Sequence, residues 1–186
     1  MRQLIFSTGN IQKFENGRAA CLQAGIELLQ QKLDIDEIQG EDSEVIIRDK
    51  AKKAFEILRQ PVVVSDDSWH IPGLKGFPGP YMKSMNHWFT PDDFLHLTRS
   101  LKDRRIILVQ LLAYYDESQQ KVFRQEYTGE LLKEARGNHN ITSQAIITMP
   151  GDNGLSIAEV YDRDVNHAAR EVSAGWHELI KWYQAL

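Results

Sequence analysis

The fold is decided first by the stretch LIFSTGNIQKF, residues 4–14. Its first three apolar residues are typical of a short buried strand, and the polar turn STGN follows at residues 7–10. From Ile11 to Ala24 the apolar residues recur at helical spacing, which predicts a helix. A strand that turns through a glycine into a helix exposes backbone N–H groups that can hold phosphate, and Lys13 adds a cation one turn in. A plain capped helix with a solvated lysine has the same pattern, so this motif alone does not decide the function.

The rest of the chain predicts helices and strands in alternation, followed by a meander. We expect further strands at residues 33–38, 61–64, 105–115, 121–132, 142–149 and 155–160, with 105–115 and 121–132 paired through the turn at 116–120. We expect further helices at 43–58 with Ser43 as cap, from near Tyr81, from Pro91 with Thr90 as cap, and at 166–183. Such an order predicts an α/β fold: a mixed central sheet flanked by helices, in two lobes with a cleft between them. The 186 residues fit a single domain, 1–186, built in this way.

Composition and charge exclude several classes of protein. The formal net charge is −4 and no block of lysine and arginine stands out, so a nucleic-acid polymer is not an expected partner. The longest apolar stretch, Ile106 to Tyr115, contains Gln110 and is too short to span a membrane, so no membrane association is expected. Cys21 is the only cysteine, which excludes an intrachain disulfide and favours a cytoplasmic protein.

Acidic residues follow two of the predicted strands. Asp36 and Glu37 close the second strand, and the run SDDS, residues 65–68, follows three valines. Adjacent carboxylates beside a buried strand resist ionisation unless a cation neutralises them, and a divalent metal would do so. Neighbouring strand residues point to opposite faces, so we expect only one of Asp66 and Asp67 to face the cleft. An Asx turn that caps the loop is the alternative interpretation.

A magnesium site is the metal centre that these acids fit. Glu37 could complete a carboxylate pair for Mg²⁺, which prefers a few carboxylates, water and phosphate oxygens. Lys50 lies nearby in the run KAKK, residues 50–53, and spacing alone does not choose among its lysines.

Together these segments resemble the inosine triphosphate pyrophosphatase family. The matching segments are TGNIQK at 8–13, EIQG at 37–40, PVVVSDDSW at 61–69 and LKGFPGPY at 74–81. The resemblance implies Mg²⁺-dependent hydrolysis of a nucleoside triphosphate, ITP or XTP among the possible substrates, to the monophosphate and pyrophosphate. It also implies a small nucleotide as ligand and a homodimer.

The resemblance further implies roles for individual residues. It assigns catalysis to Lys13, Lys50, Asp66 and Asp67, Mg²⁺ to Glu37 and Asp66, and substrate contacts to Thr8, Gly9, Asn10, Ser68, Trp69 and Arg170. Counting back from the loop GFPG, residues 76–79, aligns Asp66 with the family's second acid. A slip of one residue would exchange Asp66 and Asp67.

The resemblance fails where the family holds the base. The family follows its Arg-Gly pair with Gly-Phe-Gly-Tyr/Trp-Asp-Pro, whose aromatic and acid help to hold the base, whereas Arg136-Gly137 precedes NHNITSQ, residues 138–144. A site that loses its hydrogen-bonding partners loses most of its discrimination. His139 and His167 are candidate new contacts, and Trp69 is a candidate stacking residue. Two alternatives therefore remain open: a nucleotide-binding homologue with weak or no turnover, and a pyrophosphatase for modified pyrimidine or ordinary nucleotides.

Overall fold

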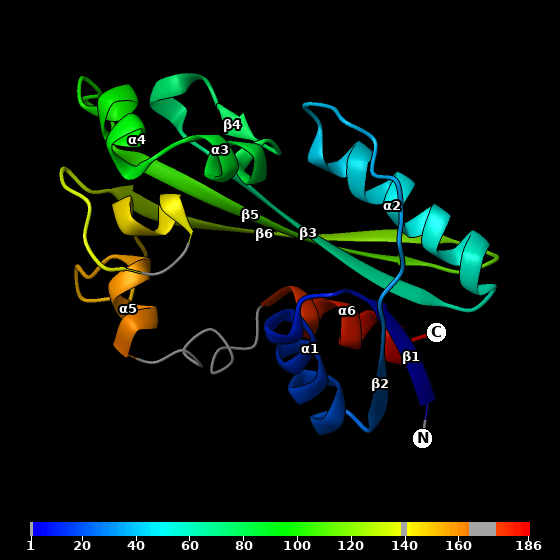
Figure 1. The fold of residues 1–186 in the computed structure, drawn as a ribbon. Helices are drawn as coiled ribbons and strands as arrows, with labels where there is room; N and C mark the ends of the chain where they lie inside the picture. The colour runs from blue at the N-terminus through cyan, green and yellow to red at the C-terminus, as the bar shows by residue number, and fades with distance from the viewer. Residues whose placement is uncertain (1, 139–140, 164–173) are drawn as a thin grey trace. The chain divides into compact units, whose positions relative to one another are not determined.

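The computed structural model describes residues 2–138, 141–163 and 174–186 (Figure 1). Its helices are α1 (Ile11–Gln23), α2 (Ser43–Leu58), α3 (Met82–Trp88), α4 (Pro91–Thr98), α5 (Ile157–Arg163) and α6 (Ala174–Gln184), with 3-10 helices η1 (Pro72–Leu74) and η2 (Thr142–Ile146). Its strands are β1 (Arg2–Ser7), β2 (Ile26–Gln31), β3 (Val62–His70), β4 (Pro78–Gly79), β5 (Arg105–Tyr115), β6 (Gln120–Leu131) and β7 (Ile147–Thr148). Of the helices in these ranges, none is long and apolar enough to cross a membrane.

The strands form one mixed sheet in the order β2-β1-β3-β5-β6-β7, and β4 pairs with β3 outside this path. β1 runs parallel to both β2 and β3, whereas β4 and β7 pair in the antiparallel sense. The predicted mixed central sheet with flanking helices is therefore confirmed.

The chain divides into two compact units. Of the described residues, unit 1 holds 2–66, 110–125 and 174–186, and unit 2 holds 67–109, 126–138 and 141–163. β3, β5 and β6 each contribute residues to both units. The cleft that the sequence predicts stays a prediction.

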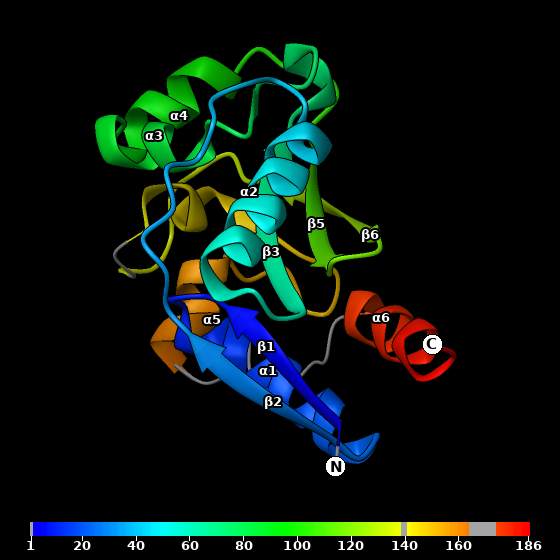
Figure 2. The same cartoon turned by 90° about the vertical axis from the view of Figure 1, so that its right-hand side faces the viewer.

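In unit 1 the helices cover both faces of the strands, with α1 and α6 on one face and α2 on the other (Figures 1 and 2). The core toward α1 and α6 includes Leu4, Phe6 and Val63, which alternate with residues of the opposite face. The rings of Phe6 and Trp176 pack edge to face with centroids 5.1 Å apart. Gly17 of α1 permits this packing, since a Cβ there would lie 2.4 Å from the Trp176 ring.

Unit 2 has its own core between α3, α4, η2 and the strands. Its buried members are Ile71, Met82, Met85, Phe94, Ile106, Leu131, Ile146 and Ile147. α4 begins with the predicted cap: Thr90 and Asp93 form a reciprocal capping box, and Pro91 is in the first turn.

Two strand predictions in the first half of the chain are wrong. The second strand is β2, not residues 33–38, because Gly25 with φ 70° turns the chain directly from α1 into Ile26. β3 does not end at Val64 but continues to His70, because β4 provides backbone partners for Trp69 and His70. The α2 boundary is as predicted, although the capping side chain is Asp42 instead of Ser43.

Two more strand predictions fail in the second half. Residues 142–149 form η2 and only a two-residue strand, and the Ser143 amide donates to the Asn86 side chain at 2.8 Å instead of to a neighbouring strand. Residues 155–160 begin helix α5, because Ser156 and Glu159 form reciprocal backbone bonds of a capping box. The predicted helix 166–183 is α6 where it is described, and residues 166–173 lie outside the described part.

Candidate active site

Two chain segments leave the unit 1 sheet beside the acidic part of β3. In the parallel register Ser7 is level with Gln31 of β2 and with Val64 of β3. The turn at residues 8–10 and the loop that starts at Lys32 therefore begin beside the part of β3 that follows Val64, and β3 itself continues to His70. The carboxyl ends of parallel strands commonly hold ligands in α/β folds.

The turn after β1 is organised by its own side chains. Asn10 Oδ1 accepts hydrogen bonds from the backbone amides of Gln12 and Lys13 at 2.9 and 3.2 Å. Thr8 Oγ1 accepts one from the Asn10 amide at 3.1 Å, and the Gln30 side chain donates to the Thr8 carbonyl. The backbone N–H groups that the sequence suggested for phosphate binding are thus partly satisfied, and a phosphate here would meet side-chain donors such as the Asn10 amide nitrogen and Lys13.

Lys32 is a residue of this turn that the sequence interpretation missed. A Cβ on Gly9 would lie 3.5 Å from the Lys32 Cδ and Cε atoms, so the lysine stem packs along the turn. Little in the sequence pointed to Lys32, because it directly precedes residues 33–38, which were mistaken for the second strand. Gly9 itself has neither a positive φ nor a steric clash that would require glycine.

Lys50 links the loop after β2 to the end of β3. Its Nζ lies 2.7 Å from Glu37 Oε1 and donates to the Ser65 carbonyl at 3.3 Å. The Lys50 side chain is only 17% exposed, whereas Glu37 is 43% exposed. Glu37 lies in the loop after β2 and not at a strand end. Its carboxylate and the carbonyl of Ser65, the residue before Asp66, therefore contact the same ammonium group.

The alternation of β3 separates the two aspartates. Val63 belongs to the core on the α1 and α6 face, so Val62 and Val64, also fully buried, belong to the α2 face. By the same alternation Asp66 points to the α2 face, where Lys50 lies, and Asp67 points to the other. Both are half-buried.

The remaining predicted substrate contacts lie in unit 2 or outside the described residues. Ser68 is buried, and its hydroxyl lies 3.0 Å from His70 Nε2. Trp69 is half-buried and pairs with Gly79. Arg170, like His139 and His167, lies outside the described residues. The roles given to Ser68, Trp69 and Arg170 stay predictions.

The unit 1 acids fit a metal that takes part of its coordination from the substrate. In the described ranges no three side chains of His, Cys, Asp or Glu gather as a complete ligand set. Mg²⁺ needs only one or two carboxylates when phosphate oxygens and water complete its shell. In this structure Glu37 pairs with the Lys50 ammonium, and Asp66 lies on the same face of β3 as Lys50.

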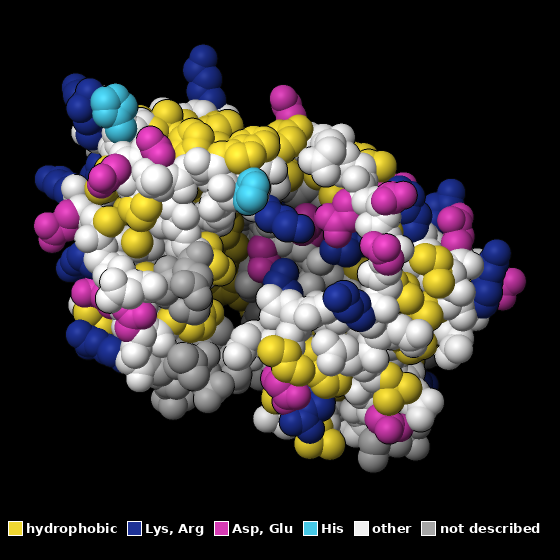
Figure 3. Space-filling view, in the orientation of Figure 1, with side chains coloured by type: hydrophobic (Ala, Val, Ile, Leu, Met, Phe, Trp, Pro, Cys, Tyr) yellow, Lys and Arg dark blue, Asp and Glu magenta, His cyan; other side chains and the backbone are white. Residues whose placement is uncertain are grey.

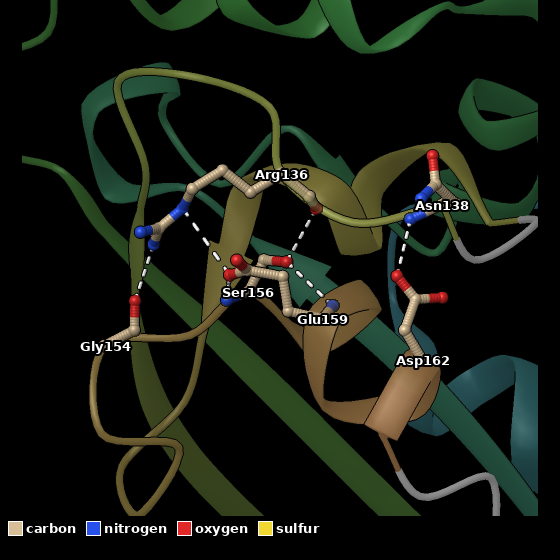
Figure 4. Close-up of polar contacts among 6 residues, drawn as sticks. All are labelled: Arg136, Asn138, Gly154, Ser156, Glu159 and Asp162. Carbon is tan, nitrogen blue, oxygen red and sulfur yellow. Dashed lines mark hydrogen bonds and ion pairs between the residues drawn. The ribbon is translucent and has the colours of Figure 1, made fainter.

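The Arg-Gly pair at residues 136–137 is held by α5 and by the loop before it (Figure 4). Arg136 donates to the Gly154 carbonyl and lies 3.6 Å from Glu159 Oε2, while Ser156 donates to the Arg136 carbonyl at 2.7 Å. Gly137 has φ 85°, and a Cβ there would lie 2.6 Å from the Glu159 amide, so glycine is required. The Arg-Gly pair therefore has a structural role in this chain.

Gln144 of η2 is a second residue that the sequence did not single out. Its Oε1 is buried without a hydrogen-bond partner in the described part of the chain. A buried amide oxygen without a partner costs about 1–3 kcal/mol. A ligand donor at this position would remove that cost.

Comparison with known proteins identifies the family of the chain. Residues 4–173 match the model of the Ham1 family. A dITP/XTP pyrophosphatase of Methanopyrus kandleri is 29% identical over 181 residues, which cover 95% of this chain and 96% of that protein. An inosine triphosphate pyrophosphatase of Yarrowia lipolytica is 43% identical over 86 residues, 46% of this chain and 43% of that protein.

A solved structure shares this fold. A HAM1 protein from Coxiella burnetii superposes with a TM-score of 0.79 at 18% identity, over 100% of both chains. The family resemblance predicted from the sequence is thus confirmed. The chain belongs to the Ham1 family.

Proposed function

We propose that this protein is a nucleoside-triphosphate pyrophosphohydrolase that converts its substrate to the nucleoside monophosphate and pyrophosphate. The observation that carries the proposal is the Lys50 ammonium, which lies within 3.3 Å of both Glu37 and the Ser65 carbonyl. Ser65 directly follows Val64, which is level with Ser7 at the start of the turn at residues 8–10. The names of the full-length relatives support the same reaction class.

Hydrolysis of a triphosphate depends mainly on positioning and on neutralising charge. Lys13 and Lys50 would bind phosphate oxygens and stabilise the charge that develops on the pyrophosphate leaving group. A carboxylate, Asp66 with Asp67 as the alternative, would orient water against the α-phosphorus and accept its proton. The new P–O bond forms as the bond from the α-phosphorus to the bridging oxygen breaks, and the pyrophosphate leaves with that oxygen.

Mg²⁺ is the metal that we propose for this site. Glu37 and Asp66 would hold it, and it would supply charge neutralisation on the phosphates. Both carboxylates belong to unit 1, and Asp66 shares the α2 face with Lys50, so this assignment uses residues of one unit only.

Substrate choice is the part of the proposal that depends on unit 2. The relatives' names suggest dITP and XTP as first substrates to test. We assign Gln144 to the base, because its buried Oε1 has no hydrogen-bond partner in the described residues and its amide offers both a donor and an acceptor where the family has an aspartate nearby in sequence. Ser68, Trp69 and Arg170 remain proposed contacts of the nucleotide.

We also propose a cytoplasmic homodimer. The single cysteine, Cys21, is buried, and burial raises the pKa of its thiol to about 12, which suits a reduced, unreactive side chain. The homodimer follows from the family resemblance, and light scattering of the purified protein would test it.

The first experiment is pyrophosphate release from a panel of triphosphates in the presence of Mg²⁺. The panel contains dITP, XTP, the ordinary purine nucleotides and a modified pyrimidine nucleotide. Release from dITP or XTP well above the others supports the proposal. Binding of these nucleotides without release from any of them would instead identify a homologue without turnover.

A further inference from the structure

Unit 2 contains a cavity of about 580 Å³ along one face of α4. Asp92, Leu95, His96 and Arg99 of this region follow one another at helical spacing, and Leu101, Lys102, Arg104 and Lys133 complete the wall. All of these residues belong to unit 2, and none is a candidate residue of the active site. A concave space of about 300–1,000 Å³ is the usual size of a small-molecule site.

The wall of this cavity is strongly basic in an acidic protein. It includes Arg99, Lys102, Arg104 and Lys133 against the single carboxylate of Asp92, so it carries more positive than negative charge although the chain has a net charge of −4. Figure 3 shows lysine and arginine side chains together with a histidine over the region of α4, at the upper left. Arg99, Lys102 and Lys133 make no ion pair with the described residues.

Arg104 is the fixed cation of the cavity. Its guanidinium donates to the backbone carbonyls of Leu131 at 2.8 Å, Leu132 at 2.6 Å and Thr98 at 3.3 Å. These bonds hold a half-buried positive charge in place without a carboxylate partner in the described ranges. They also satisfy the Thr98 carbonyl at the end of α4, where the negative end of the helix dipole would otherwise oppose an anion.

Two acids next to lining residues in the sequence, Asp93 and Asp103, are committed to other groups. Asp103 forms an ion pair with Arg105 at 2.7 Å, and the hydrogen bonds from Arg105 lower the pKa of Asp103 to about 2. Asp93 accepts from the Thr90 backbone and hydroxyl in the capping box. Asp103 and Asp93 therefore neutralise or cap their own neighbours instead of the cavity lysines.

We propose that this cavity is a second anion site, separate from the proposed active site, that binds a small molecule with closely spaced phosphate groups. Arg104 provides a rigid charge, and Arg99, Lys102 and Lys133 provide mobile ones that close around the phosphates. The proposal does not depend on the proposed enzymatic function, because none of these groups belongs to the Glu37–Lys50–Asp66 cluster.

Leu95 and Leu101 make the site observable by itself. Both leucines line the cavity, so their methyl resonances report its occupancy even if phosphates also bind elsewhere in the protein. We would titrate the full chain with inorganic tripolyphosphate, in the presence of EDTA, and follow these methyl groups by NMR. Repeating the titration with a nucleoside diphosphate distinguishes the source: equal affinity indicates a bare polyphosphate, and tighter binding of the nucleotide indicates a nucleotide site.

The variant K102E/K133E tests the charge, and K83E/K121E is its control. Both double variants replace two exposed lysines by glutamate and so change the net charge equally. Lys83 and Lys121, however, do not line the cavity. We expect K102E/K133E to weaken tripolyphosphate binding at the leucine methyls by about tenfold or more, and the control to change it by about twofold or less. Thermal melts of both variants check that they fold.

Two results would overturn the proposal. One is the absence of saturable methyl shifts at millimolar tripolyphosphate in the wild type. The other is equal weakening by the cavity variant and the control, which would indicate attraction by overall charge. A failure to release pyrophosphate from nucleotides would contradict the proposed enzyme but would leave the outcome of this titration unaffected.

Discussion

Replacing Lys50 by methionine separates a catalytic role from a structural one. Lys50 Nζ contacts Glu37 at 2.7 Å and the Ser65 carbonyl at 3.3 Å. Methionine keeps most of the stem of the lysine and removes only the charge and the donors. Any loss therefore reports the ammonium and not the packing of α2 on the sheet.

The two expected magnitudes differ strongly. Glu37 is 43% exposed and regains water when its partner is removed, so the free energy of unfolding should fall by only about 1 kcal/mol. A cation that stabilises charge in the transition state is worth on the order of 10²–10³ in turnover. We therefore expect a nearly unchanged urea midpoint with a loss of kcat of that order.

Lys53 provides a closely matched control on the same helix. It also pairs with a carboxylate, Asp49 at 2.8 Å, and also donates to a backbone carbonyl, that of Asp36 at 2.7 Å. Its contacts differ from those of Lys50 in that none of them reaches β3. Lys53→Met should cost a similar free energy of unfolding and leave kcat within about threefold.

The assay is pyrophosphate release at saturating nucleotide, with unfolding followed by circular dichroism. Equal losses of kcat in Lys50→Met and Lys53→Met would refute the role of Lys50, since both would then act through α2. So would a Lys50→Met protein that retains full kcat.

Three further predictions concern the fold of unit 1. Gly17→Ala should destabilise the protein by about 1–3 kcal/mol despite the better helix propensity of alanine, because its Cβ would meet the Trp176 ring at 2.4 Å; urea unfolding would show the loss. Asn10→Ala removes the cap of α1 and should cost about 1 kcal/mol in the same measurement, with a raised KM for the nucleotide. Burial raises the pKa of Asp116, but hydrogen bonds from Tyr114 and its turn outweigh this and hold the pKa below its usual value. The stabilisation by Asp116 is therefore present above about pH 4 and lost as the pH falls further, so the stability gap between wild type and Asp116→Asn should shrink in acid.

The sequence predicted the elements whose signals are local. The first strand and helix, the helix at 43–58, the cap at Thr90 and the strand pair joined near Asp116 are all confirmed. The prediction of the second strand was wrong because apolar and polar residues also alternate at 33–38. The choice between these residues and residues 26–31 depends on the turn at Gly25. Helix α5 was not predicted, although the sequence contains its start signal. Ser156 and Glu159 have the spacing of a capping box but were placed in a strand.

The site was predictable to the extent that it follows strand ends. Placing acids directly after Val64 and a polar turn after β1 was enough to predict that both begin at the same level of the sheet, although the acids lie within β3 and not after it. The choice of Lys50 among the lysines of α2 came from the family resemblance and not from spacing. Its contacts to Glu37 and Ser65 depend on where the irregular loop after β2 runs, and no local pattern encodes the course of that loop.

Asn10 shows how a residue singled out by pattern can offer a ligand a different group from the one first expected. The sequence suggested that bare amides at the start of α1 hold phosphate, but Asn10 Oδ1 already accepts from two of them. Its side-chain nitrogen is then directed away from those amides and becomes the donor left for a ligand, with Lys13 one turn further on. A serine would keep the cap but has no such amide, whereas an alanine loses both functions. Asn10→Ser should therefore keep the stability of the wild type within about 0.5 kcal/mol while raising the KM as Asn10→Ala does, and a serine variant with wild-type KM would show that phosphate does not contact this side chain.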